Sequence, residues 1–316
     1  GSMPHSELPR EVPWMPPVVN CGPKGREKLQ MSKTENTGTT RTPRAVAIDI
    51  LARWLESGDF PDRLIPPDTP SRAFVMELVY GVVKRQRTLE WILGGCVERA
   101  PSDIVRTCLL TGIYQLIFMD DVAEYASVSE TVEAVKAREK KSANFANAVL
   151  RRVQREKKAI LQALHRQPVQ IAESFPDFLV ERWNRLFGAE KTKALCQWSN
   201  EPAGVIIRPN RLKTSAADFL ASLRTAGLDA QPHPFAPEEY LVLGHGIRVS
   251  DLPGYAEGLF MVQDPSTSVS IKLLNPQPGE TVLDACAAPG GKAILISEYM
   301  KEEGTLVAMD LHADRI

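Results

Sequence analysis

The chain has 316 residues, of which 43% are hydrophobic and 24% are charged, a composition typical of a globular protein with two or three domains. Its 38 Lys and Arg residues nearly balance 39 Asp and Glu residues, which excludes a uniformly basic nucleic-acid-binding surface but allows a local basic patch. It has no apolar run of about 18 residues and no secretory signal, so we exclude a membrane-spanning or secreted protein and expect a cytoplasmic one. The cysteines lie far apart without zinc-ligand spacing, which predicts reduced thiols and no bound metal; they are Cys21, Cys96, Cys108, Cys196 and Cys286.

Residues 1–40 differ in composition from the rest of the chain. Gly1-Ser2 before Met3 resembles the scar of a cleaved tag, and the following segment is rich in proline without apolar periodicity. We expect a tag scar followed by a disordered extension, with the natural start left open between Met3 and Met31.

Residues 41–166 are predicted to form one all-helical domain. Thr42 followed by Pro43 is typical of a helix start, and the apolar residues after it recur at i, i+3, i+4 and i+7. Similar spacing recurs around residues 75–82 and 102–118. Ser127-x-x-Glu130 predicts a capping box at the start of a further helix.

The end of this helical domain is rich in basic residues. Nine Lys or Arg residues fall between positions 136 and 158, against only Glu139 and Glu156. They form either a solvated helix face or a surface that binds RNA phosphates, because a cation near a phosphate releases a condensed counterion. The candidate RNA-binding residues are Lys136, Arg138, Lys140, Lys141, Arg151, Arg152 and Arg155.

Residues 167–262 are predicted to comprise a helical linker and a small α+β subdomain. Periodicity predicts strands over 205–207 and 240–243 and a helix over 215–226. Four polar residues of this segment either help to hold RNA or lie on a loop surface; they are Arg208, Asn210, Arg211 and Lys213.

Residues 263–316 carry the motif with the most chemical content. A helix start at Asp264-Pro265-Ser266 precedes a predicted buried strand over 281–284, a Gly-rich loop, a helix over 294–300 and a second strand over 305–309. Asp310 follows the second strand. Because ligands bind beyond the carboxyl ends of strands in open α/β sheets, and a carboxylate there can bind a ribose, the pattern predicts an adenosine-type cofactor.

The loop from Asp284 to Lys292 distinguishes between adenosine cofactors. Cys286 and Ala293 occupy the positions of the first glycine and the hydroxyl residue of a Walker loop, and the G-x-G-x-x-G pattern of dinucleotide loops is absent. The sequence therefore favours S-adenosylmethionine over ATP or a dinucleotide. The alternative is a strand–helix turn with a purely structural role.

These segments together resemble the NOL/NOP2/Sun family of RNA cytosine-5 methyltransferases. The resemblance rests on the loop from Asp284 to Lys292, with Val262-Gln263-Asp264 before it and residues 307–310 after it. Upstream, residues 78–85, 112–116 and 130–133 resemble the NusB-like RNA-binding domain of the bacterial branch that methylates small-subunit ribosomal RNA. The implied fold is an all-α NusB-like N-terminal domain (41–166), a small α+β middle subdomain (167–262) and the start of an α/β Rossmann-like methyltransferase domain (263–316).

The resemblance also implies roles for single residues. The loop would hold the methionine end of S-adenosylmethionine and the acid after the second strand its ribose, so the cofactor-binding set is Cys286, Ala287, Ala288, Pro289, Gly290, Gly291, Lys292 and Asp310. Asp284 is expected to brace the loop. Lys292 either lies on the surface or pairs with Asp284 or with a cofactor carboxylate.

No catalytic residue is assigned within the chain. By resemblance, one cysteine thiolate attacks C6 of cytosine and a second cysteine assists elimination, both in motifs after the third and fourth strands, beyond Ile316. Cys286 belongs to the cofactor loop and is expected to be a small packing residue. We therefore expect a truncated, inactive fragment, whose two strands and one helix lean on residues 200–262, bind a second copy or stay poorly ordered. The alternative function is a non-catalytic RNA-binding or assembly module.

Overall fold

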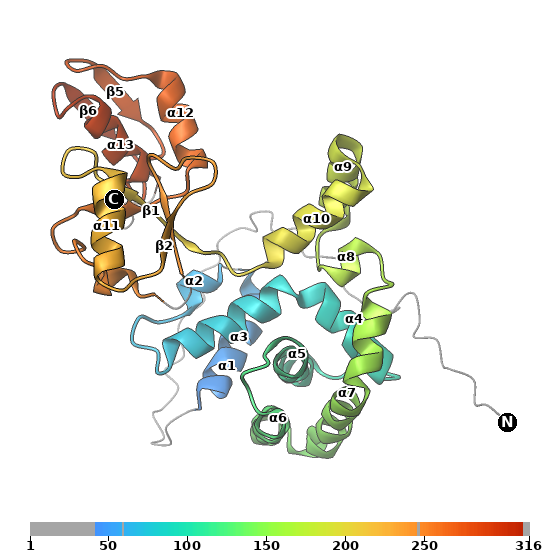
Figure 1. Cartoon of the computed structure of the whole chain (residues 1–316). Helices are drawn as coiled ribbons and strands as arrows, with labels where there is room; N and C mark the ends of the chain where they lie inside the picture. Colours follow the sequence, from blue (N-terminus) through green and yellow to red (C-terminus); the bar gives the residue numbers. More distant parts are fainter. Residues whose placement is uncertain (1–41, 59, 245–246, 312–316) are drawn as a thin grey trace. The chain divides into compact units, whose positions relative to one another are not determined.

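The computed structural model describes residues 42–58, 60–244 and 247–311. The chain divides into two compact units between Glu201 and Pro202 (Figure 1). The expected extension over residues 1–40, which includes Cys21, lies outside the described residues. Among the described helices, none is both long enough and apolar enough to cross a lipid bilayer.

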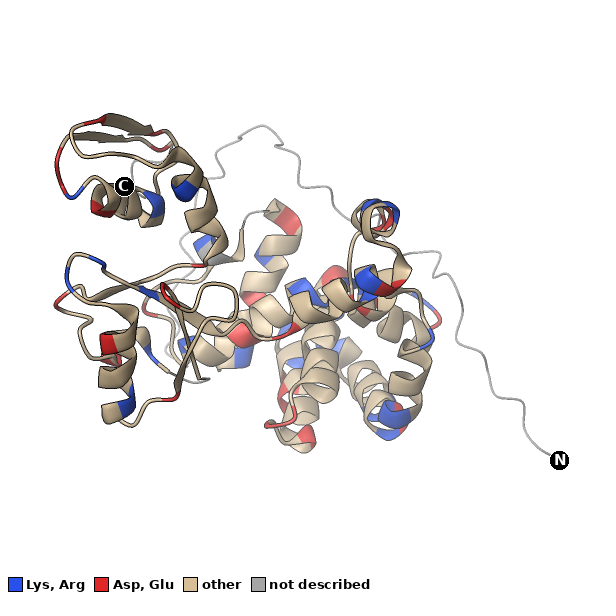
Figure 2. Ribbon diagram, turned by 45° about the horizontal axis from the view of Figure 1, so that its top comes forward, with Lys and Arg blue, Asp and Glu red and all other residues tan. Residues whose placement is uncertain are grey.

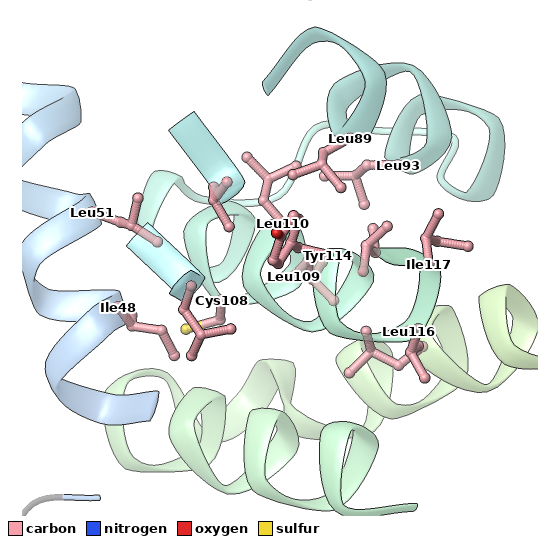
Figure 3. Close-up of a cluster of buried hydrophobic side chains, with 14 of the residues drawn as sticks. Ile48, Leu51, Leu89, Leu93, Cys108, Leu109, Leu110, Tyr114, Leu116 and Ile117 are labelled. Atoms are coloured by element: carbon pink, nitrogen blue, oxygen red, sulfur yellow. The ribbon is translucent and has the colours of Figure 1, made fainter. Parts of the chain in front are cut away.

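The described part of residues 42–166 folds into helices alone, as the apolar spacing predicts. Helix α5 is buried along its length, and α1, α3, α4, α6 and α7 all pack against it (Figure 1). Figure 3 shows the aliphatic side chains that meet α5, among them Ile48, Leu51, Leu89 and Leu93. The elements are α1 (Pro43–Ser57), α2 (Pro61–Leu64), α3 (Arg72–Lys84), α4 (Gln86–Cys96), α5 (Asp103–Phe118), α6 (Glu124–Arg138), the 3-10 turn η1 (Lys140–Ser142) and α7 (Ala143–Leu164).

The two predicted helix starts of this region have different outcomes. Thr42 is the N-cap of α1, and its side-chain oxygen accepts a hydrogen bond from the Ala45 N–H at 3.2 Å, which confirms the prediction. The capping box is wrong, because α6 begins at Glu124 and Ser127 lies inside it. The buried Ser127 hydroxyl donates to the Ala123 carbonyl at 3.3 Å, so it is satisfied within the helix and does not cap it.

The contact between α3 and α5 depends on a glycine. Gly81 on α3 faces the ring of Tyr114 on α5, and a Cβ atom at Gly81 would lie 2.0 Å from Tyr114 Cζ. The Tyr114 hydroxyl donates to Glu77, also on α3, at 2.6 Å. Burial of the phenol, together with this acceptor, raises the pKa of Tyr114 above its ordinary value. The absent side chain at Gly81 therefore makes room for a buried, hydrogen-bonded ring.

The helical segment after α7 belongs to the N-terminal unit and does not form a free linker. The start of α4 holds it through two ion pairs, Arg85 with Glu173 and Arg87 with Asp177, each at 3.0 Å. The Arg85–Glu173 pair is largely shielded from solvent, so it is screened less than an exposed pair. The elements of the segment are α8 (Val169–Ala172), α9 (Asp177–Phe187) and α10 (Ala189–Asn200).

The C-terminal unit begins with a four-stranded antiparallel sheet in the order β2-β3-β1-β4. The predicted strands over 205–207 and 240–243 and the helix over 215–226 are confirmed, whereas β2 and β4 were not predicted. Helix α11 packs on the sheet through Phe219 and Leu223, which share a buried core with Ile207 and Leu241. The elements are β1 (Val205–Pro209), α11 (Ala216–Thr225), β2 (Ala230–Pro232), β3 (Leu241–Leu243), the 3-10 turn η2 (Val249–Asp251) and β4 (Phe260–Val262).

A strand–helix–strand segment with parallel strands follows, as predicted. The prediction of a buried first strand is only half right, because Val282 and Asp284 are buried while Leu283 between them is 59% exposed. The preceding helix starts one residue later than predicted, and Asp264 Oδ1 accepts from the Ser266 N–H at 2.8 Å. The elements are α12 (Ser266–Leu274), β5 (Thr281–Asp284), α13 (Gly291–Tyr299) and β6 (Thr305–Ala308).

This strand–helix–strand segment leans on the antiparallel sheet, which is one of the three arrangements expected for it. Arg208 of β1 forms an ion pair with Glu298 of α13 at 2.5 Å, and both side chains are almost fully buried. The two roles expected for Arg208 were binding RNA or lying on a loop surface. Both are wrong, because its side chain is buried. Arg211 lies over the ring of Tyr299, 4.9 Å from its centroid.

Replacement of Gly81 by Ala should destabilise the helical unit. The added methyl group overlaps the Tyr114 ring, and overpacking of a buried contact costs about 1–3 kcal/mol, more than the helix propensity gained from Ala. Thermal and urea unfolding of the single variants Gly81→Ala and Tyr114→Leu and of the double variant would measure the coupling. We expect a smaller penalty for Gly81→Ala when Tyr114 is already Leu. A Gly81→Ala protein as stable as the parent would contradict this account of the contact.

Candidate cofactor-binding site

The loop after β5 begins with a buried carboxylate. Asp284 is 7% exposed, and its Oδ1 atom accepts a hydrogen bond from the Cys286 N–H at 3.2 Å. Lys292 Nζ lies 3.8 Å from the same oxygen. Asp284 therefore braces the loop from the strand end, as the sequence predicts, and Lys292 pairs with it across the loop.

Backbone hydrogen bonds join the loop to the end of β6. The Ala287 N–H donates to the Met309 carbonyl, and the Met309 N–H donates to the Asp284 carbonyl, each at 2.9 Å. The Ala288 N–H donates to Asp310 Oδ2 at 3.0 Å. The structure thus brings Asp310 beside the loop, 22 residues away in sequence from Ala288.

The loop ends in a backbone conformation that requires glycine. Gly290 has φ of 102°, in the left-handed region that residues with a side chain rarely adopt. A Cβ atom at Gly290 would have no atom of the described residues within 4 Å, so they leave the space beside this backbone open. Gly290 immediately precedes α13, whose first N–H groups have no partners within the helix. The loop therefore offers unhindered backbone beside a helix N-terminus.

Cys286 does not pack inside the protein. Its side chain is exposed, whereas Cys108 and Cys196 are buried and Cys96 is intermediate. The expectation that Cys286 is a small packing residue is therefore wrong, because its backbone N–H, and not its side chain, is what ties this position to Asp284. The four described cysteines are free thiols, as predicted.

Figure 2 marks the Lys and Arg residues in blue along the helices, and the predicted basic residues differ in their contacts. Arg138 is part-buried and joins α6 to α1 through an ion pair with Asp49 at 2.5 Å. Lys136, Arg152 and Arg155 form ion pairs with neighbouring acidic residues of their own helices at 3.1–3.2 Å. Of the candidate RNA-binding residues, those exposed at the turn before α7 or on α7 are Lys140, Lys141, Arg151 and Arg155.

Sequence reasoning missed the role of two residues next to the site: Gln263, which contacts the loop end, and Arg208, which holds Gln263. Gln263 Nε2 donates to the carbonyl of Gly291 at 3.0 Å, and Arg208 Nε donates to Gln263 Oε1 at 2.5 Å. Gln263 lies in the Val262-Gln263-Asp264 motif used above, but the motif gave it no role. Arg208 was singled out only as an RNA-binding or surface residue, because a buried arginine in a strand cannot be told from an exposed one by sequence.

The residues present fit an adenosine cofactor with a methionine tail. Asp284 Oδ2 is a buried oxygen without a hydrogen-bond partner among the described residues, and a buried acceptor of this kind calls for a donor such as an amino group. The open space beside Gly290 would admit such a group. The described residues contain no group of three or more His, Cys, Asp or Glu side chains suited to a metal ion.

Comparison with known proteins gives three matches to protein families in chain order. Residues 41–155 match the NusB family, residues 175–250 match the ferredoxin-like domain of RsmF/B-like methyltransferases, and residues 271–316 match the 16S rRNA methyltransferase RsmB/F family. The last match includes the loop, α13 and Asp310.

Curated relatives are similar to this chain over most of its length. A probable ribosomal RNA small subunit methyltransferase B of Synechocystis is 37% identical over 79% of this chain and 58% of its own length. The ribosomal RNA small subunit methyltransferase B of Pseudomonas putida is 33% identical over 86% of this chain and 63% of its own. The chain thus spans about three fifths of the length of these relatives.

A solved structure shows the same fold at low sequence identity. The crystal structure of PH0851 matches 88% of this chain and 65% of its own, with a TM-score of 0.58 and 20% identity. By these three family matches in chain order and by the identity with these relatives, the chain is similar to the RsmB/F family of 16S rRNA methyltransferases.

Proposed function

We propose that the chain is the RNA-binding and cofactor-binding part of an enzyme that transfers a methyl group from S-adenosylmethionine to C5 of cytosine in small-subunit ribosomal RNA. One observation carries the proposal: the glycine loop after β5 is hydrogen-bonded to the acidic residue after β6, in a unit with parallel strands. This arrangement supports a nucleoside site at the carboxyl ends of the strands of a Rossmann-like domain. The similarity to methyltransferases of small-subunit ribosomal RNA supports ribosomal RNA as the substrate.

S-adenosylmethionine would supply an electrophilic methyl group on a sulfonium. The protein's part is to bind and orient. Asp310, whose carboxylate accepts from the Ala288 N–H, has two oxygens that can together accept several bonds, and ribose hydroxyls are suitable donors. The backbone around Gly290 and the Asp284 carboxylate would hold the methionine end.

The helical unit would bind RNA through exposed cations. Lys140 and Lys141 lie on the turn before α7, and Arg151 and Arg155 are exposed on α7 itself. Such residues position a nucleic acid through its phosphates without reading its sequence. Arg138 is expected to act mainly as the anchor of α6, because its guanidinium already binds Asp49 and the Ala45 carbonyl.

The cysteines described in the structure do not suit nucleophilic attack on cytosine. Burial raises the pKa of the Cys96 and Cys108 thiols to about 11 and also raises the pKa of the buried Cys196 thiol, which keeps all three protonated at neutral pH. Cys286 is exposed but lies on the cofactor loop, where the methionine end would bind. We therefore propose that the nucleophile is none of these residues and that the 316-residue chain binds its ligands without turnover.

Calorimetric titration with S-adenosylmethionine tests the cofactor site. We expect the parent chain to bind and Asp310→Ala to bind about 10–100-fold more weakly, as for the loss of charge-assisted hydrogen bonds. Asp251→Ala, which removes an exposed carboxylate in the same unit, is the matched control and should bind as the parent does. Equal affinity of the Asp310→Ala and Asp251→Ala variants would remove Asp310 from the site, and a parent chain that does not bind would refute the cofactor proposal.

Incubation with tritiated S-adenosylmethionine and unmodified small-subunit ribosomal RNA tests turnover. We expect no tritium in 5-methylcytosine after nuclease digestion and chromatography, because a suitable thiolate is missing among the described residues. Label in 5-methylcytosine that disappears with Cys286→Ala would overturn the assignment of Cys286 to cofactor binding alone.

The salt dependence of RNA affinity tests the basic surface. The slope of log K against log salt should become shallower by about 0.7–0.9 for each phosphate that the protein no longer neutralises. The double variant Lys140→Ala/Lys141→Ala should therefore lower the slope by roughly 1.5 in fluorescence anisotropy with a ribosomal RNA fragment. Lys191→Ala/Lys193→Ala on α10 removes the same charge elsewhere and should leave the slope unchanged. Equal slopes for both double variants would place the RNA elsewhere.

A further inference from the structure

A buried arginine lies in the middle of the antiparallel sheet. Arg208 is on β1, which pairs with β3 on one side and β4 on the other. Its side chain is 2% exposed. A charge in this position is costly unless hydrogen-bonded partners compensate it. The hydrogen-bonded partners of Arg208 therefore make its burial possible.

The guanidinium of Arg208 divides its hydrogen bonds between two parts of the C-terminal unit. Its Nη1 atom donates to Glu298 Oε2 near the end of α13, and its Nε atom donates to Gln263 Oε1 just after β4, both at 2.5 Å. The Gln263 N–H also donates to the Ile206 carbonyl at 3.1 Å. Gln263 is thus fixed by the sheet through both its backbone and its side chain.

Gln263 passes this constraint to the start of α13. With its oxygen held by Arg208, its Nε2 atom points to the Gly291 carbonyl and donates to it at 3.0 Å. A Cβ atom at Gly291 would lie 3.3 Å from Gln263 Nε2, so the glycine permits this close contact. Gly291 directly follows Gly290, the last residue of the loop. Gln263 and Arg208 therefore hold α13 at both ends.

We propose that Arg208 and Gln263 are positioning residues for the cofactor loop, so that the antiparallel sheet sets where the loop lies over β5 and β6. The identity of the cofactor rests on the proposed function, whereas the positioning of the loop by Gln263 does not. A buried ion pair adds little net stability compared with apolar packing, whereas its directed hydrogen bonds fix geometry. Neither residue is assigned a contact with the cofactor.

The variant Gln263→Glu separates positioning from stability. A glutamate keeps an acceptor for Arg208, so the sheet stays joined to α13, but it cannot donate to the Gly291 carbonyl. We expect the midpoint of thermal unfolding to fall by about 5 °C or less, as for the loss of one hydrogen bond. In hydrogen exchange of the unliganded chain, followed by mass spectrometry, amides of residues 286–292 should exchange about fivefold faster, as for the loss of one hydrogen bond. The dissociation constant for S-adenosylmethionine should rise about fivefold or more.

Glu239→Gln is the matched control. Glu239 forms an ion pair with Lys272 at 2.8 Å, which joins the sheet region to α12 and includes no residue of the loop. This variant should leave loop exchange and cofactor affinity as in the parent. If Gln263→Glu also leaves both unchanged, or if Gln263→Glu and Glu239→Gln change them equally, the positioning role is refuted. If the parent does not bind S-adenosylmethionine, the cofactor proposal fails, and the exchange measurement still decides the positioning role by itself.

Discussion

The arrangement of the elements in the C-terminal unit depends on one buried guanidinium, that of Arg208. Two parallel strands and a single helix bury too little apolar surface to stay folded alone in water, and Leu283 and Val307 on β5 and β6 are indeed exposed. The segment shares a small apolar core with α12, in which Ile271 meets Val282 and Leu295. Arg208, whose charge can be buried only while Glu298 and Gln263 bind it, fixes the place of the segment against the antiparallel sheet. The segment that carries the cofactor loop is thereby tied to a sheet formed from residues much earlier in the chain.

The loop achieves its form with backbone groups more than with side chains. The Ala287 and Ala288 N–H groups bind the end of β6, and Gly290 turns the chain into α13. Small residues serve this purpose because the loop must approach β6 closely on one side and leave space on the other. A run of alanine, glycine and proline can therefore indicate function. Such residues leave space beside the backbone for a ligand and keep backbone N–H groups accessible.

The sequence was most informative where a residue type has only one reasonable structural use. Thr42 before Pro43 was predicted correctly as a helix start for this reason, whereas cofactor binding by the loop glycines and by the acid after β6 stays a prediction. Strands β2 and β4 have three residues each, too few for alternation to be recognised. Ser127 was misread because a serine satisfies itself equally well inside a helix and at its start. Arg208 and Gln263 could not be assigned, because their partners Glu298 and Gly291 lie 90 and 28 residues further on.

The hydrogen bond from the Ala288 N–H to Asp310 has a thermodynamic consequence. A carboxylate that binds the loop and would also bind a ribose links the two ends of the proposed ligand through a single side chain. Linkage is reciprocal. If nucleoside binding favours the ordered loop by a given factor, the ordered loop must raise the affinity for the nucleoside by the same factor. Adenosine and methionine, offered as separate molecules, would then not bind as independent ligands, and the intact cofactor would gain from the cooperation between its halves.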